Sequence, residues 1–153
     1  MKRVNLKKVL NFIIKSLTFI TLSFLVKFSA LFFINSANSI DNKVFSLIFV
    51  KNTGAAFSLF QDYTHILIWL SSIILLYIVI YIVKNSASIS KIKITTLSLL
   101  TAGIAGNLYE RISDGFVTDY IKLNFINFPV FNAFDILITI GAFLLIITLY
   151  NSK

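Results

Sequence analysis

Two aspartates, Asp119 and Asp135, stand out in a chain that is otherwise made mostly of apolar residues. Two carboxylates held close together resist ionising at once, so they share a proton, and one serves as base while the other serves as acid. Such a pair can activate a water molecule to attack a peptide carbonyl. The segment between the two aspartates is long enough for the chain to fold back, and we expect their carboxylates to converge.

Other site chemistries have less support in this sequence. The chain has no cysteine, which excludes disulfides, thiolate metal sites and a cysteine nucleophile. Its only histidine, His65, has no second histidine nearby, so a zinc site would lack its usual ligands. Nothing beyond the carboxylates supports a magnesium or calcium site, and no serine is flanked by glycines or has an obvious lysine partner. We therefore expect neither a metal nor an organic cofactor, and an interfacial position for His65.

The composition places these residues in a membrane protein. Of the 153 residues, 58% are hydrophobic and only 13% are charged, which leaves too few polar side chains to cover a soluble globule. The formal net charge of +8 then fits loops facing anionic lipid better than a nucleic-acid surface. No internal repeat or low-complexity linker interrupts the chain, so we expect one domain over residues 1–153.

Hydropathy predicts four membrane-spanning helices, at roughly residues 10–34, 65–83, 94–109 and 134–150. The basic N-terminus and the long first apolar run favour a retained signal-anchor helix over a cleaved signal peptide. Basic residues cluster before the first helix, between the second and the third, and after the fourth. By the positive-inside rule, both termini are cytoplasmic and the segments 35–64 and 110–132 face outward.

The two outward segments hold the polar residues of interest. In the first, "KVFSLIFVKNTGAAFSLF" consists of β-prone runs separated by a turn at Asn52–Gly54, which predicts a small extracytoplasmic strand element. In the second, Pro129 argues against a helix. The predicted fold class is therefore an all-α membrane protein with four transmembrane helices and a small strand element outside the membrane.

Each candidate site residue also has a purely structural interpretation. Asp135 begins the fourth helix, where a carboxylate can serve as an N-terminal cap. Asp119 can be a solvated charge at the membrane surface, and the long side chain of Arg111 can reach lipid headgroups. Spacing alone does not decide between these interpretations and a catalytic pair.

Three blocks of this sequence resemble the type II signal peptidase (lipoprotein signal peptidase) family, and they lie in the family's order and spacing. The blocks are "KNTGAAFSLF" at residues 51–60, "GNLYERISDGFVTDYI" at residues 106–121 and "FNAFDILITIG" at residues 131–141. They resemble the family's Asn-x-Gly-x-x-Phe, Gly-Asn-x-x-Asp-Arg…Gly-x-Val-x-Asp and Phe-Asn-x-Ala-Asp…Gly patterns. The resemblance covers nearly the whole chain.

The resemblance implies a membrane aspartic endopeptidase that removes the signal peptide from diacylglyceryl-modified prolipoproteins, cleaving before the lipidated cysteine. It implies Asp119 and Asp135 as the catalytic pair. It also implies a small extracytoplasmic β-cradle with a mobile flap, in which the "NTGAAF" loop closes over the site. Partners would be the prolipoprotein substrate and membrane lipid, with the chain acting as a monomer in the bacterial cytoplasmic (inner) membrane and the site toward the outer face. The residues implied to line or shape the substrate site are Asn52, Gly54, Asn107, Arg111 and Asn132.

Within this resemblance, glycines and charges acquire expected roles. Gly106 should allow close helix approach, and Gly115 should permit the turn that aims Asp119 inward. Arg111 should hold a lipid phosphate or a substrate carbonyl. No family role is implied for Asp114, which we expect to be a solvated loop charge.

Three positions depart from the family pattern. Glu110 replaces an aspartate before Arg111, which adds a methylene and can shift the arginine. Phe134 replaces a small alanine before Asp135, and its ring would narrow the pocket or point to lipid. Lys27 matches a family lysine while Ser23 replaces the family's aspartate, so Lys27 either extends to the membrane surface or meets Glu110.

Two other functions fit parts of the pattern. A small channel or transporter subunit would use the aspartates to line an ion path, and it would show flux without peptide cleavage. A non-catalytic lipoprotein-binding relative, closed to water by Phe134, would bind substrate without forming product. The peptidase interpretation accounts for all three blocks.

Overall fold

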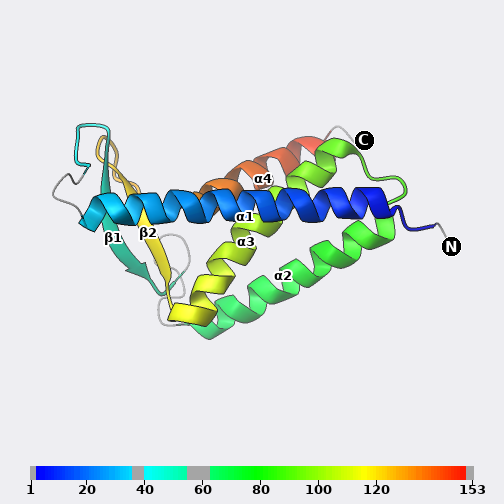
Figure 1. The fold of residues 1–153 in the computed structure, drawn as a ribbon, viewed down its shortest axis with the longest axis horizontal. Helices are drawn as coiled ribbons and strands as arrows, with labels where there is room; N and C mark the ends of the chain where they lie inside the picture. The colour runs from blue at the N-terminus through cyan, green and yellow to red at the C-terminus, as the bar shows by residue number, and fades with distance from the viewer. Residues whose placement is uncertain (1–2, 36–39, 55–62, 151–153) are drawn as a thin grey trace.

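The computed structural model describes residues 3–35, 40–54 and 63–150. Its helices are α1 (Leu6–Asn35), α2 (Thr64–Asn85), α3 (Lys91–Asp114) and α4 (Ala133–Tyr150), and its strands are β1 (Phe45–Asn52) and β2 (Val117–Leu123). The strands lie at one end of the helices, while α1 begins and α4 ends at the opposite end (Figure 1). The second β-prone run and the flap expected from the "NTGAAF" loop fall largely on residues 55–60, outside the described residues.

Three of the described helices, α1, α2 and α4, are long and apolar enough to cross a membrane. The fourth, α3, is the most polar and packs against each of the other three helices. Buried polar side chains such as Thr96, Ser98 and Asn107 therefore face protein rather than the surroundings. Its apolar residues Ile94, Leu97 and Leu100 join Phe12 and Ile82 in the core at the end away from the sheet.

Local signals set the ends of α3, and these ends lie beyond the predicted bounds. The Ser90 side chain accepts a hydrogen bond from the backbone N–H of Lys93 at 3.3 Å, which caps the first turn. Gly115 ends the helix with a left-handed φ of +80°, as expected for the turn toward Asp119. The predicted boundary at residue 110 between the third helix and the following segment is therefore wrong, because Glu110 and Arg111 belong to the last turns of α3.

The sheet consists of β1 and β2 in antiparallel pairing. The β-prone run before Asn52 predicts β1, but its partner strand comes from the segment after α3, which the sequence did not predict to be a strand. Val50 lies opposite Asp119, and Asn52 lies opposite Val117. Phe131 then pairs with Ile121, donating its N–H to the Ile121 carbonyl at 3.1 Å. Pro129 is not part of a helix, as predicted. The chain turns back after β2, and the pairing of Phe131 with Ile121 places residue 132 beside the middle of β2.

Candidate active site

Asp119 lies in β2 with only 2% of its surface exposed. Its Oδ2 accepts a hydrogen bond from Nδ2 of Asn52 on the neighbouring strand, at 2.8 Å. Its Oδ1 accepts a second hydrogen bond from Nδ2 of Asn132, also at 2.8 Å. The carboxylate is thus oriented from both sides by amides, and its interpretation as a solvated surface charge is wrong.

Asp135 is the third residue of α4 and takes part in a reciprocal cap of that helix. The Asn132 Oδ1 accepts the backbone N–H of Asp135 at 3.0 Å, and Asp135 Oδ2 accepts the backbone N–H of Asn132 at 3.0 Å. Asn132 is therefore the N-cap residue, and Asp135 is its partner. The other carboxylate oxygen, Oδ1, accepts a hydrogen bond from Nδ2 of Asn107 on α3, at 2.8 Å.

The two asparagines also connect the two carboxylates. Asn132 Nδ2 donates to Asp119 and also to Oδ1 of Asn107, at 3.2 Å, and Nδ2 of Asn107 donates to Asp135. Asn132 is 1% exposed and Asn107 is 7% exposed. A buried amide network therefore runs from one aspartate to the other, and it fixes both of them relative to α3.

Arg111 is buried against the end of β1 and does not extend to the surface. One guanidinium nitrogen donates to the Gly54 carbonyl at 2.7 Å, and the other donates to the Asn107 carbonyl at 3.4 Å. The Asn52 side chain accepts the Gly54 N–H at 2.9 Å, which closes the turn after the strand. Among the described residues, the buried Nε of Arg111 has no hydrogen-bond partner. The interpretation of Arg111 as a side chain that reaches lipid headgroups is therefore wrong.

A cavity of about 810 Å³ adjoins these groups. Six of the seven residues expected at the site line it, and the seventh, Asn132, lies behind the two carboxylates. The remaining walls are mostly apolar and come from α2, α4 and the segment around Pro129. The expected lining residues are Asn52, Gly54, Asn107, Arg111, Asp119 and Asp135.

Burial changes the acidity of Asp119. Loss of solvent raises its pKa to about 6 from the usual value near 3.8, against the opposing hydrogen bond from Asn52. The nearby charge of Asp135 raises the pKa further. Asp119 can therefore hold or release a proton near neutral pH, as an acid or base requires.

The comparisons with known proteins agree with this geometry. The family model described as signal peptidase (SPase) II matches residues 9–151. The chain belongs to the signal peptidase II family. A lipoprotein signal peptidase of Streptococcus thermophilus (strain CNRZ 1066) is 34% identical over 110 residues, which cover 72% of this chain and 71% of the relative. One from Lactococcus lactis subsp. lactis (strain IL1403) is 38% identical over 110 residues and covers 72% of each chain.

Solved structures support the same assignment. A bacterial membrane enzyme solved by the in meso method at 2.3 Å resolution superposes with a TM-score of 0.80 at 26% identity, covering 92% of this chain and 88% of that one. A second, solved at 1.9 Å resolution, gives a TM-score of 0.78 at 25% identity and covers 94% of each chain. This signal peptidase II family member is therefore an integral membrane peptidase.

One ion pair bears on the departures at residues 110 and 23. Lys27 Nζ on α1 lies 2.8 Å from Glu110 Oε2 on α3, and both side chains are buried. The same Oε2 accepts the backbone N–H of Thr118 at 2.7 Å, one residue before Asp119. Lys27 therefore meets Glu110, and its charge is balanced without a carboxylate at the buried Ser23. From the sequence, Lys27 was expected either to extend to the membrane surface or to meet Glu110. Nothing in the sequence indicated the hydrogen bond between Glu110 and the backbone of Thr118.

Phe134 neither narrows the cavity nor points to lipid, so both expectations are wrong. It is 1% exposed, does not line the cavity, and packs its ring on Gly106 of α3 and on Phe24 of α1. A Cβ at Gly106 would lie 2.2 Å from this ring, which confirms that Gly106 allows close helix approach. Gly106 leaves a space between α3 and α4, and the Phe134 ring fills it.

Tyr120 was not expected at the site. Its hydroxyl oxygen accepts the backbone N–H of Ala133 at 3.1 Å, which joins the residue after Asp119 to the first residue of α4. Only its position beside Asp119 could have drawn attention to it. Asp114 is exposed, as expected of a solvated charge, but it is the last residue of α3 and not part of a loop. His65 is exposed at the start of α2. Within the described parts of the chain, no group of three or more His, Cys, Asp or Glu side chains could hold a metal ion.

Proposed function

We propose that this chain is an aspartic endopeptidase that removes the signal peptide from diacylglyceryl-modified prolipoproteins, cleaving before the lipidated cysteine. Asp119 and Asp135 are the catalytic pair. The proposal rests on one observation above all: both carboxylates line one cavity and are joined through Asn107 and Asn132. The names of the relatives, lipoprotein signal peptidases, give the substrate class.

In the proposed mechanism the two carboxylates share one proton. One of them takes a proton from a water molecule while the water oxygen attacks the scissile carbonyl. The other gives its proton to the developing oxyanion or to the leaving amine as the C–N bond breaks. The pair titrates as a unit, so its two apparent pKa values belong to both residues. This chemistry needs neither metal nor organic cofactor.

The remaining site residues have positioning roles in this proposal. Asn52, Asn107 and Asn132 hold the carboxylate oxygens with their amide N–H groups, so the aspartates do not need to reorient during the reaction. Arg111 fixes the Gly54 carbonyl and with it the end of β1, which forms a wall of the cavity beside the substrate. Its Nε is buried and has no hydrogen-bond partner among the described residues.

We also propose that all four helices span the inner membrane as a single domain. With 24 residues, α3 is about 36 Å long, enough to cross a hydrocarbon core of about 30 Å, and its polar groups are covered by the other helices. The basic residues at the start of α1 and around the α2–α3 connection lie at the end away from the sheet (Figure 1). This distribution supports cytoplasmic termini, with the sheet and the aspartates at the outer face. We propose a monomer as the functional unit.

The test is a gel-shift cleavage assay with purified protein in nanodiscs. The substrates are a diacylglyceryl-modified prolipoprotein and its unlipidated precursor. Asp119→Asn and Asp135→Asn should abolish cleavage of the lipidated form, while the matched control Asp114→Asn should retain it because Asp114 is exposed at the end of α3. A chelator should have no effect. Cleavage that survives in either active-site variant would overturn the assignment of the pair, and binding without cleavage by the unmodified protein would indicate a non-catalytic relative.

A further inference from the structure

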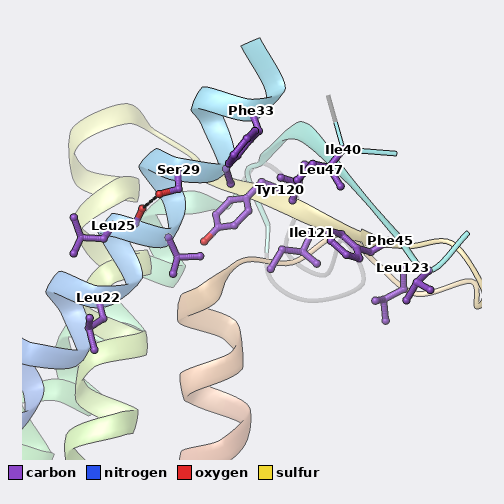
Figure 2. Close-up of a pocket in the computed structure, with 13 residues that line it drawn as sticks. Leu22, Leu25, Ser29, Phe33, Ile40, Phe45, Leu47, Tyr120, Ile121 and Leu123 are labelled. Atoms are coloured by element: carbon purple, nitrogen blue, oxygen red, sulfur yellow. Dashed lines mark hydrogen bonds between the residues drawn. The ribbon is translucent and has the colours of Figure 1, made fainter. Parts of the chain in front are cut away.

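A second cavity lies between the sheet-proximal end of α1 and the sheet (Figure 2). Its volume is about 850 Å³, and it shares only Leu123 with the cavity that holds the aspartates. We call it the α1 groove. It is lined by Leu22, Leu25, Val26, Ser29, Ala30, Phe33, Ile40, Val44, Phe45, Leu47, Tyr120, Ile121 and Leu123.

The α1 groove presents almost no polar atoms to an occupant. Ser29 donates its hydroxyl proton to the Leu25 carbonyl one turn earlier on α1, at 2.9 Å. The Tyr120 hydroxyl oxygen accepts a hydrogen bond from the backbone N–H of Ala133 at 3.1 Å. The other lining side chains are hydrocarbon. A protein segment would bring backbone amides that this lining cannot satisfy, whereas an acyl chain has no such groups.

The dimensions of the α1 groove also match an acyl chain. The wall formed by α1 runs from Leu22 to Phe33, which is about 16 Å along a helix axis. One leaflet of a bilayer has a hydrocarbon depth of about 15 Å, half of the whole core. The groove therefore extends through about one leaflet, at the sheet-proximal end of a helix that is long and apolar enough to span the membrane.

We propose that the α1 groove holds one acyl chain of a bilayer phospholipid from the leaflet nearest the sheet. This lipid is distinct from the acyl chains of the substrate, because Tyr120 lines the groove while Asp119 lines the other cavity, and neighbouring residues of a strand face opposite sides of the sheet. The Tyr120 ring is itself 1% exposed, so the occupant covers the partly exposed side chains of Leu47, Ile121 and Leu123 beside it. Tyr120 follows Asp119 and bonds to the first residue of α4, so the lipid packs beside the residue that joins the two elements that carry the carboxylates.

The groove should select for the chain and not for the headgroup. Lys43 and Asp41 lie close in sequence to the lining residue Val44, and Lys122 lies between Ile121 and Leu123 but on the alternate face of β2, so charges of both signs are nearby. The Asp41 carboxylate already accepts the Ser46 hydroxyl. Nothing in this arrangement favours an anionic over a zwitterionic headgroup.

The first experiment fills the groove from an exposed position. Ser29→Trp puts a bulky ring in the groove without replacing a buried side chain. Thr18→Trp is the matched control, because Thr18 is also exposed on α1 and its hydroxyl also bonds to the carbonyl four residues earlier. Each full-length protein is reconstituted with phosphatidylglycerol and phosphatidylethanolamine, together with a phosphatidylcholine that carries a diazirine near the end of one chain. Crosslinked peptides are then mapped by mass spectrometry.

We expect strong labelling of residues 22–33 and 120–123 in the wild type and in Thr18→Trp, and a loss of most of it in Ser29→Trp. Even labelling along α1, or labelling unchanged in Ser29→Trp, would overturn the proposal. Displacement of the label by excess diacylglyceryl-modified prolipoprotein would overturn the assignment to a bilayer lipid and point to a substrate chain.

A second experiment uses only the wild type, so it does not depend on folding of a variant. Lipids retained after washing in detergent are measured by native mass spectrometry, across a series of chain lengths and headgroups. Retention should rise with chain length at a constant headgroup and should not change with headgroup charge at a constant chain. Retention that follows the headgroup instead would contradict an acyl-chain site. These readouts are independent of cleavage, so they also distinguish this proposal from the proposed peptidase mechanism.

Discussion

Removing the charge of Lys27 should destabilise the protein through Glu110. Lys27 Nζ lies 2.8 Å from Glu110 Oε2, and the two side chains are 10% and 1% exposed. Without the lysine, the carboxylate would keep a single hydrogen bond, from the Thr118 N–H. Its other oxygen already has no partner among the described residues. Lys27→Met keeps the long apolar stem and removes only the charge.

The expected loss is large because a buried charge is left without its partner. Breaking a buried ion pair from one side costs about 3–5 kcal/mol, which corresponds to a fall of roughly 6–20 °C in Tm for a chain of this size. Glu110 also fixes the backbone next to Asp119, so kcat should fall together with the stability. Lys27→Met/Glu110→Gln removes both charges and should recover a substantial part of the Tm.

The measurement is thermal unfolding of the purified variants in one detergent, followed by circular dichroism, with cleavage measured in parallel. Lys15→Met is the matched control, because Lys15 lies on the same helix and donates to the neutral Thr95 hydroxyl. Loss of a hydrogen bond to a charged group costs about 1.5–3 kcal/mol, and less where the group is partly exposed, so Lys15→Met should be less destabilising than Lys27→Met. A Lys27→Met protein as stable as Lys15→Met, or a double variant no better than Lys27→Met, would refute the reasoning.

Three further predictions concern the site and its supports. Because Asp119 has a pKa of about 6, it loses its proton as the pH rises through that value, so kcat/KM should fall above it. A flat kcat/KM between about pH 5 and pH 8 would contradict this. Asn132→Ser keeps an N-cap acceptor but loses the amide that reaches Asp119; kcat should fall roughly 10–100-fold while Tm changes little, measured by cleavage and circular dichroism. Gly106→Ala puts a Cβ against the Phe134 ring and should cost about 1–3 kcal/mol in thermal unfolding. Adding Phe134→Leu should recover part of that loss, and purely additive losses would show that the two residues do not share one space.

The resemblance of three sequence blocks to the signal peptidase II family, and not hydropathy, predicted which polar residues meet at the site. Hydropathy located the helices, and polar groups are costly in so apolar a chain, so those that remain are informative. All seven expected residues contribute to the cavity or lie directly behind it. The β-prone run before Asn52 and the left-handed Gly115 were also predicted, because the signals for both are local.

The end of α3 could not be predicted, because its charges are satisfied by distant residues. Glu110 and Arg111 are typical of a solvated loop when only their neighbours in sequence are considered. Their partners are Lys27 on α1 and Gly54 after β1, and no local pattern connects these positions. The orientation of Phe134 was missed for the same reason, since Gly106 makes room for its ring from another helix.

The two interpretations of Asp135, as a helix cap and as a catalytic group, turn out to be compatible. One carboxylate oxygen accepts the backbone N–H of Asn132 in the cap of α4, and the other faces Asn107. The cap residue Asn132 donates in turn to Asp119. A helix N-terminus also favours a carboxylate in its first turn. The bonds that start α4 therefore hold a buried carboxylate in place, and this lowers the energetic cost of keeping two acidic groups beside an apolar cavity.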